Sequence, residues 1–134
     1  MLKKTVTYEN YDGVMVTEDL YFNLTRSEIM EMEYMTEGGY VDMLEKAGNK
    51  QDKPTMFKAI KDIVMKAYGE KSPDGKHFMK SEAISHAFSC TPAYDALFME
   101  LVTDADKSAK FFNAIIPEGS ASNAGAPVIT PNAL

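Results

Sequence analysis

Residues 52–69, DKPTMFKAIKDIVMKAYG, constrain the fold more than any other segment of the sequence. Asp52 is a typical N-cap, and Pro54 suits the first helical turn, where a missing N–H loses no hydrogen bond. Gly69 is expected to end the helix. Apolar side chains recur every three or four residues and define one face, formed by Phe57, Ile60, Ile63, Val64, Ala67 and Tyr68. This face must be buried, so the rest of the chain has to cover it.

The N-terminal residues alternate polar and apolar side chains, which is typical of β-strands. Val6 and Tyr8 alternate with threonines, and Asp12-Gly13 tolerates the left-handed backbone of a tight turn. We therefore expect a β-hairpin over residues 3–24. Its returning strand is expected to bury one face, made of Val14, Val16, Leu20, Phe22 and Leu24. Two strands alone are marginal in water and need helices to pack on.

Further helix signals follow the hairpin. Thr25 and Glu28 form a capping box before an apolar run, which predicts a helix that begins near Arg26. The double glycine at positions 38–39 is expected to end it. Additional helices are expected near residues 40–47, 82–88, 92–102 and 104–116.

The stretch KSPDGKHFMKS, residues 71–81, is predicted to form a turn and not a ligand-binding loop. Proline, aspartate and glycine occupy the last three positions of residues 72–75, as a type I turn accepts. A calcium loop requires several alternating oxygen ligands, and here only Asp74 and Ser72 qualify. A phosphate-binding loop requires repeated glycines that lead into a helix, and this stretch has one glycine.

Together these signals predict an α+β fold, in which an N-terminal β-hairpin packs on a mainly α-helical domain of about five to six helices. A chain of 134 residues with 45% hydrophobic content supports one compact domain, expected over residues 1–116, with the helices in 26–116. Residues 117–134 hold three prolines, two glycines and one charged side chain. We expect a flexible C-terminal tail there, because such a segment buries too little apolar area to offset its ordering entropy.

Composition argues against several functional classes. The net charge of −6 disfavours nucleic-acid binding, which depends on clustered lysine and arginine. No run of about 18 apolar residues occurs, and no apolar segment follows the N-terminal lysines, so we expect neither a membrane span nor export. Cys90 is the only cysteine and cannot form an internal disulfide, which indicates an intracellular protein.

Charge is distributed unevenly along the chain. Residues 1–52 carry five basic and eleven acidic side chains, whereas residues 53–80 carry seven basic and three acidic ones. Much of the basic block is the polar face of the helix at 52–69. We expect the blocks to pair within the fold or to face solvent, and a basic binding face is the less favoured alternative.

No catalytic or metal-binding motif is recognisable, and no cofactor is expected. His77 and His86 lack the spacing and the partners of a metal site, so both are interpreted as surface residues. Cys90 precedes a proline-led helix but has no histidine at an evident base position, and we interpret it as a small, semi-buried residue. We expect four glutamates of the first helix region to lie on a solvent-exposed face and not in a catalytic site: Glu28, Glu31, Glu33 and Glu37.

Methionine is frequent, at ten of 134 residues. On the helix that follows Thr25, Ile29 and Met32 point one way while Met30 and Tyr34 point another. Two layers of the same protein could cover both faces. Alternatively, one face is exposed and binds varied apolar partners, because methionine is flexible and polarizable. On this hypothesis the partner-binding residues are Met30, Tyr34, Met35 and Met43.

Three stretches follow the hairpin in order: YFNLTRSEIMEME, KAYGEKSPDGKHFMKSE and TPAYDALFMELVTDADKSAKFFNAIIP. Over residues 3–117 the chain resembles the tail assembly chaperones of long-tailed, siphovirus-type bacteriophages and prophages of Gram-positive hosts. The resemblance implies a non-enzymatic protein of the host cytoplasm, not expected in the mature virion. It also implies that the chain binds apolar helical segments of the tape measure protein and keeps that protein soluble. In such families a C-terminally extended, frameshifted form often recruits the major tail tube protein.

Two alternatives to a chaperone remain open. A structural tail or connector protein of the phage particle would assemble through the edge of the hairpin. An acidic regulator would occupy the nucleic-acid site of a host protein through carboxylates such as Glu31 and Glu33. The sequence also leaves open whether the chain is a monomer or a homo-oligomer.

Overall fold

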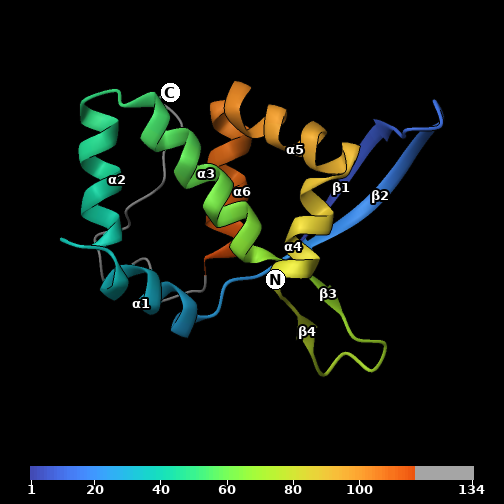
Figure 1. Ribbon diagram of the computed structural model, residues 1–134, viewed down its shortest axis with the longest axis horizontal. Helices are drawn as coiled ribbons and strands as arrows, with labels where there is room; N and C mark the ends of the chain where they lie inside the picture. The colour runs from blue at the N-terminus through green and yellow to red at the C-terminus, as the bar shows by residue number, and fades with distance from the viewer. Residues whose placement is uncertain (117–134) are drawn as a thin grey trace.

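The computed structural model describes residues 1–116, which begin as two antiparallel strands and continue largely as helices (Figure 1). This order confirms the predicted α+β class with its N-terminal hairpin. The single domain expected over residues 1–116 stays a prediction, and the tail expected over 117–134 lies outside the described residues. The elements are β1 (Leu2–Glu9), β2 (Met15–Phe22), α1 (Arg26–Met35), α2 (Tyr40–Asn49), α3 (Lys53–Ala67), β3 (Tyr68–Lys71), β4 (Phe78–Met79), α4 (Glu82–Ser89), α5 (Pro92–Thr103) and α6 (Ala105–Ile115).

The strands form a four-stranded antiparallel sheet in the order β1-β2-β3-β4. β1 and β2 pair along their whole length, whereas β3 meets β2 only at Tyr21 and Phe22. The hairpin of β3 and β4 therefore projects in a different direction from the hairpin of β1 and β2 (Figure 1).

The first hairpin confirms the predicted burial pattern near the helices but not at its tip. Leu20 and Phe22 are buried, whereas Val14 is 54% exposed. α5 packs on β1, and the turn that ends at Gly13 extends beyond that helix (Figure 1). The period-two pattern continues to the tip, but no helix covers the apolar side chains there.

α3 is the central helix and packs against α2, α4 and α5. Its first turn is as predicted, because the Asp52 side chain accepts a hydrogen bond from the Thr55 N–H and Pro54 lies in that turn. Ile60, Ile63, Val64 and Ala67 of the predicted stripe are buried. Phe57 is exposed, contrary to the prediction, and Tyr68 lies in β3 and is only partly buried. The helix ends at Ala67, however, and not at Gly69.

The sequence did not predict β3 and β4. The predicted turn at residues 72–75 is present, with the Gly75 N–H 3.0 Å from the Ser72 carbonyl oxygen, but it closes a second hairpin. Gly69 lies inside β3, where a Cβ would approach the carbonyl oxygen of Met79 to 2.8 Å. Strands of four and two residues are too short to give a period-two signal.

Phe22 lies at the centre of the hydrophobic core and is fully buried. Its ring makes edge contacts with Tyr68, Phe88 and Phe111, at centroid distances of 5.6, 6.0 and 5.0 Å. These three rings belong to β3, α4 and α6 respectively. One side chain of β2 thus connects the sheet to two helices distant in sequence.

We predict that Phe22→Ala lowers the free energy of unfolding by about 3–5 kcal/mol, because it removes a buried ring and leaves a cavity. Urea denaturation followed by circular dichroism measures this loss. Val14→Ala, on the exposed end of the same strand pair, is the control and should change stability by about 0.5 kcal/mol or less. If Phe22→Ala lowered the free energy of unfolding by no more than Val14→Ala does, the central role of this ring would be contradicted.

Candidate partner-binding site

α1 carries three of the four side chains predicted to bind a partner, and it lies at the edge of the molecule (Figure 1). The predicted capping box is present. The Thr25 hydroxyl accepts the Glu28 N–H at 3.1 Å, and the Glu28 carboxylate accepts the Thr25 N–H at 2.9 Å. The helix ends at Met35, three residues before the predicted glycine pair, and none of its residues is fully buried.

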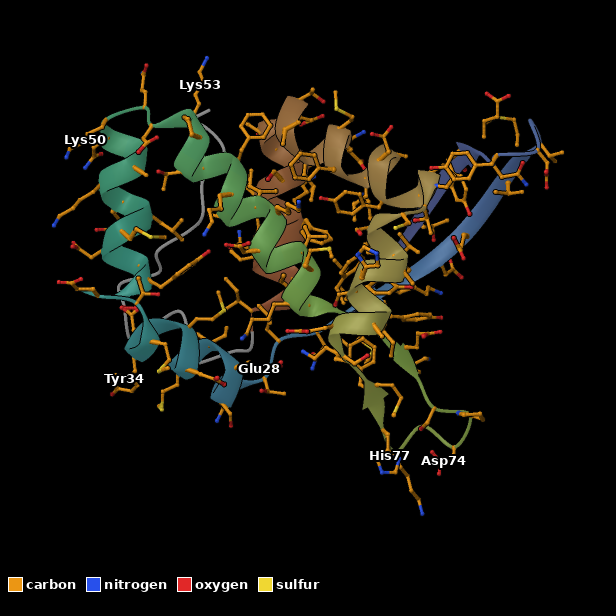
Figure 2. All side chains as sticks on the ribbon, in the orientation of Figure 1. Glu28, Tyr34, Lys50, Lys53, Asp74 and His77 are labelled. Atoms are coloured by element: carbon orange, nitrogen blue, oxygen red, sulfur yellow. The ribbon has the colours of Figure 1, made fainter. Side chains whose placement is uncertain are left out.

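Only one face of α1 packs on the core. Ile29 and Met32 are partly buried against it. Met30, Tyr34 and Met35 are 58%, 78% and 80% exposed, respectively. Figure 2 shows Tyr34 directed away from the rest of the molecule. Within residues 1–116, the second apolar face of α1 is therefore uncovered, and we call Met30, Glu31, Tyr34 and Met35 the outer face of α1.

Met43, the fourth predicted partner-binding residue, differs from the other three. It lies on α2 and is partly buried against the core. It also borders a shallow, open hollow together with Glu37, Gly38 and Asp42. The structure therefore brings Met30, Tyr34 and Met35 onto one helix face, and it places Met43 on the neighbouring helix.

Glu28 ties the start of α1 to the second hairpin. Lys80 Nζ donates to both Glu28 carboxylate oxygens, at 2.7 and 2.6 Å, and to the carbonyl oxygen of Asn23 at 2.9 Å. Burial raises the pKa of the Glu28 carboxyl, but hydrogen bonds from Lys80 and Thr25 and the charge of Lys80 outweigh burial and hold that pKa below its usual value. The prediction that Glu28 belongs to a solvated face is therefore wrong.

Glu33 ties the end of α1 to α2. Gly39, the N-cap of α2, offers no capping side chain, and the Glu33 carboxylate instead accepts the Val41 N–H at 3.2 Å. Gly39 has a φ of +92°, and a Cβ there would collide with this carboxylate. Glu33 is thus also a structural residue, contrary to the prediction, whereas Glu31 and Glu37 are exposed as expected.

The family of the chain follows from its sequence match. A family model described as phage tail assembly chaperone matches residues 1–127. The chain belongs to the phage tail assembly chaperone family. No curated protein and no solved structure matches it. Family membership indicates a role in phage tail assembly with partners among tail proteins, and it favours binding over catalysis.

The histidines and the cysteine of this tail assembly chaperone lie outside α1. His77 is exposed at the tip of the second hairpin, beside Asp74 (Figure 2). Cys90 is exposed and not semi-buried as predicted, and its Sγ lies 3.8 Å from Nε2 of His86, one helical turn earlier. The sequence analysis missed this four-residue spacing. Residues 1–116 contain no cluster of three or more histidine, cysteine or acidic side chains that could hold a metal ion.

Within the same residues, no helix is both long and apolar enough to cross a membrane. The outer face of α1 combines exposed apolar side chains with a helix that is fixed at both ends by ionic hydrogen bonds.

We predict that Lys80→Met lowers the free energy of unfolding by about 1 kcal/mol at neutral pH, because it removes the partner of the partly buried Glu28 carboxylate. The lowered pKa of Glu28 means that this stabilisation is present above the unfolded pKa and is lost as the pH falls through the folded pKa. Denaturation curves of wild type and variant should therefore converge in acid, once the pH is below the lowered folded pKa of Glu28.

Lys58→Met is the matched control for this prediction, because Lys58 pairs with Asp62 at 3.6 Å on an exposed surface. Its effect should be close to zero at every pH. A Lys80→Met effect that is equally large in acid and at neutral pH would show that the ion pair is not its source.

Proposed function

We propose that this tail assembly chaperone binds apolar helical segments of the tape measure protein and keeps that protein soluble during tail assembly. The phage would be of the long-tailed, siphovirus type, with a Gram-positive host. The exposure of Met30, Tyr34 and Met35 on one face of α1 is the observation that carries this proposal.

The outer face of α1 suits such a partner for a physical reason. Methionine has an unbranched, polarizable side chain that adapts to different apolar surfaces, and tyrosine adds a large, rigid contact area. An amphipathic helix binds by laying its apolar face against a surface of this kind. Met30 and Tyr34 are four residues apart and so project side by side.

The tethers of α1 support the same proposal. Glu28 and Glu33 hold the two ends of the helix, and Ile29 and Met32 pack against the core from its inner face, so the outer face is held in place although no α1 side chain is fully buried. A surface that is already ordered loses less conformational entropy when a partner binds. Met43, beside the end of α1, would extend the contact if the partner reaches the shallow hollow near Glu37.

The remaining parts of the proposal concern assembly in the cell. The chaperone would act in the host cytoplasm and leave before the virion is complete. Several copies along one tape measure protein would add avidity to weak individual contacts, with or without a homo-oligomer. A frameshifted, extended form would recruit the major tail tube protein. The family match supports this chaperone role over the alternative of a structural tail or connector subunit.

We predict that co-expression with the wild-type chain increases the soluble fraction of the tape measure protein, and that the triple variant Met30→Ser, Tyr34→Ser, Met35→Ser loses at least half of this increase. These substitutions remove exposed apolar area from the contact and leave the core intact. Sedimentation of lysates followed by quantitative immunoblotting measures the soluble fraction.

The matched control is the triple variant Met15→Ser, Met79→Ser, Met99→Ser. It removes three exposed apolar side chains from three other elements, so it changes surface hydrophobicity without touching α1. Equal solubility of the tape measure protein with and without the wild-type chain would refute the proposed function. Equal losses in the two triple variants would place the binding surface elsewhere.

A further inference from the structure

We infer that the segment bound by the outer face of α1 is a basic amphipathic helix, with lysine or arginine beside its apolar stripe. The inference rests on the proposed function and adds the chemistry of the partner to it. Three observations carry it: the place of Glu31 among the apolar side chains, the lack of an ion pair to it within residues 1–116, and the distribution of lysines on the neighbouring helix.

Glu31 lies within the apolar outer face and not at a separate polar face. Successive residues of an α-helix are rotated by about 100°. Around the helix axis, Glu31 therefore falls between Tyr34 and Met35, and Met30 lies on the other side of Tyr34. A helix that covers these three apolar side chains must also cover the Glu31 carboxylate.

No ion pair satisfies this carboxylate among the described residues. Glu31 and Glu37 are exposed, and neither forms an ion pair within residues 1–116. The surrounding segment, residues 26–45, has one basic side chain, Arg26, and six acidic ones, which are Glu28, Glu31, Glu33, Glu37, Asp42 and Glu45.

Two lysines beside α1, one bound to α1 itself and one on the adjoining helix α2, are already paired. Lys80 binds Glu28, and Lys46 binds Asp42 at 3.0 Å. Lys50, the C-cap of α2, and Lys53, the first residue of α3, lie beyond the end of α2 that is remote from α1 (Figure 2). Arg26, the basic residue of α1, also has a partner of its own. We therefore expect the positive charge that neutralises Glu31 on binding to come from the bound helix.

Electrostatics then selects among apolar partners. A neutral apolar helix would remove water from Glu31 without supplying a partner, which is unfavourable for a carboxylate. An acidic helix would place like charges in contact. A lysine or arginine beside the apolar stripe satisfies the carboxylate and also speeds association with this acidic region.

The test uses two synthetic helical peptides that share one leucine stripe and differ only in their flanking residues, lysine in one and glutamate in the other. Fluorescence anisotropy should show that the wild-type chain binds the lysine peptide at least about tenfold more tightly at low salt. The difference should shrink at about 0.5 M salt, because exposed charges are screened there. Equal binding of the two peptides would overturn the inference.

Variants assign the effect to the site. Glu31→Lys with Glu37→Lys should abolish the preference for the lysine peptide, whereas Glu9→Lys with Glu70→Lys, the same charge change on exposed positions elsewhere, should retain it. The inference would be overturned if the Glu31 and Glu37 variant still preferred the lysine peptide. It would also be overturned if the triple serine variant of α1 bound the lysine peptide as tightly as the wild-type chain does. Circular dichroism confirms that each variant is folded.

The same variants separate this inference from the proposed function. If the Glu31 and Glu37 variant still keeps the tape measure protein soluble and the triple serine variant does not, the chaperone role stands and the charge preference fails. If neither variant differs from wild type in that assay, the assignment of the outer face itself fails.

Discussion

The contacts of Phe22 are the interaction on which the rest of the structure depends. A single ring from β2 packs against aromatic rings of β3, α4 and α6, so sheet and helices share one core. α1 follows β2 directly, but it contributes no buried residue to that core. Ile29 and Met32 pack partly buried against the core, and polar contacts of Glu28 and Glu33 hold the two ends of the helix. The second apolar face of α1 is left available for a partner.

The carboxylates of α1 fall into two groups with different roles. Glu28 and Glu33 reach other elements, where they bind a lysine and cap a helix. Glu31 faces solvent within the outer face and gives it negative charge, and Glu37, two residues beyond the end of α1, is exposed as well. Methionine and tyrosine supply the apolar area between them. A helix with fixed ends, an adaptable apolar surface and an unpaired negative charge is well suited to binding a helical partner, in keeping with the family of tail assembly chaperones.

Local signals in the sequence predicted most of the fold. The capping box of Thr25 and Glu28 and the cap at Asp52 were predicted because their spacing alone defines the hydrogen bonds. The second hairpin was missed because its short strands depend on pairing with β2 and on the close approach at Gly69. The ion pair of Glu28 and Lys80 joins residues 52 positions apart, and no local pattern encodes such a pair.

The candidate site was predictable only in part, for a related reason. Periodicity showed that α1 has two apolar faces, but it could not indicate which of them other elements cover. That depends on where α2 and the core lie, so the exposure of Met30 and Tyr34 emerged from the tertiary structure. Met43 has the same side chain as Met30, yet its position on α2 leaves it partly buried.

Hydrogen–deuterium exchange of the chain, alone and in complex with the tape measure protein, tests the central claim most directly. The account predicts slower exchange of the backbone amides of residues 26–35 in the complex, with little change in the first hairpin. Unchanged exchange in α1, together with protection of a different surface, would contradict it.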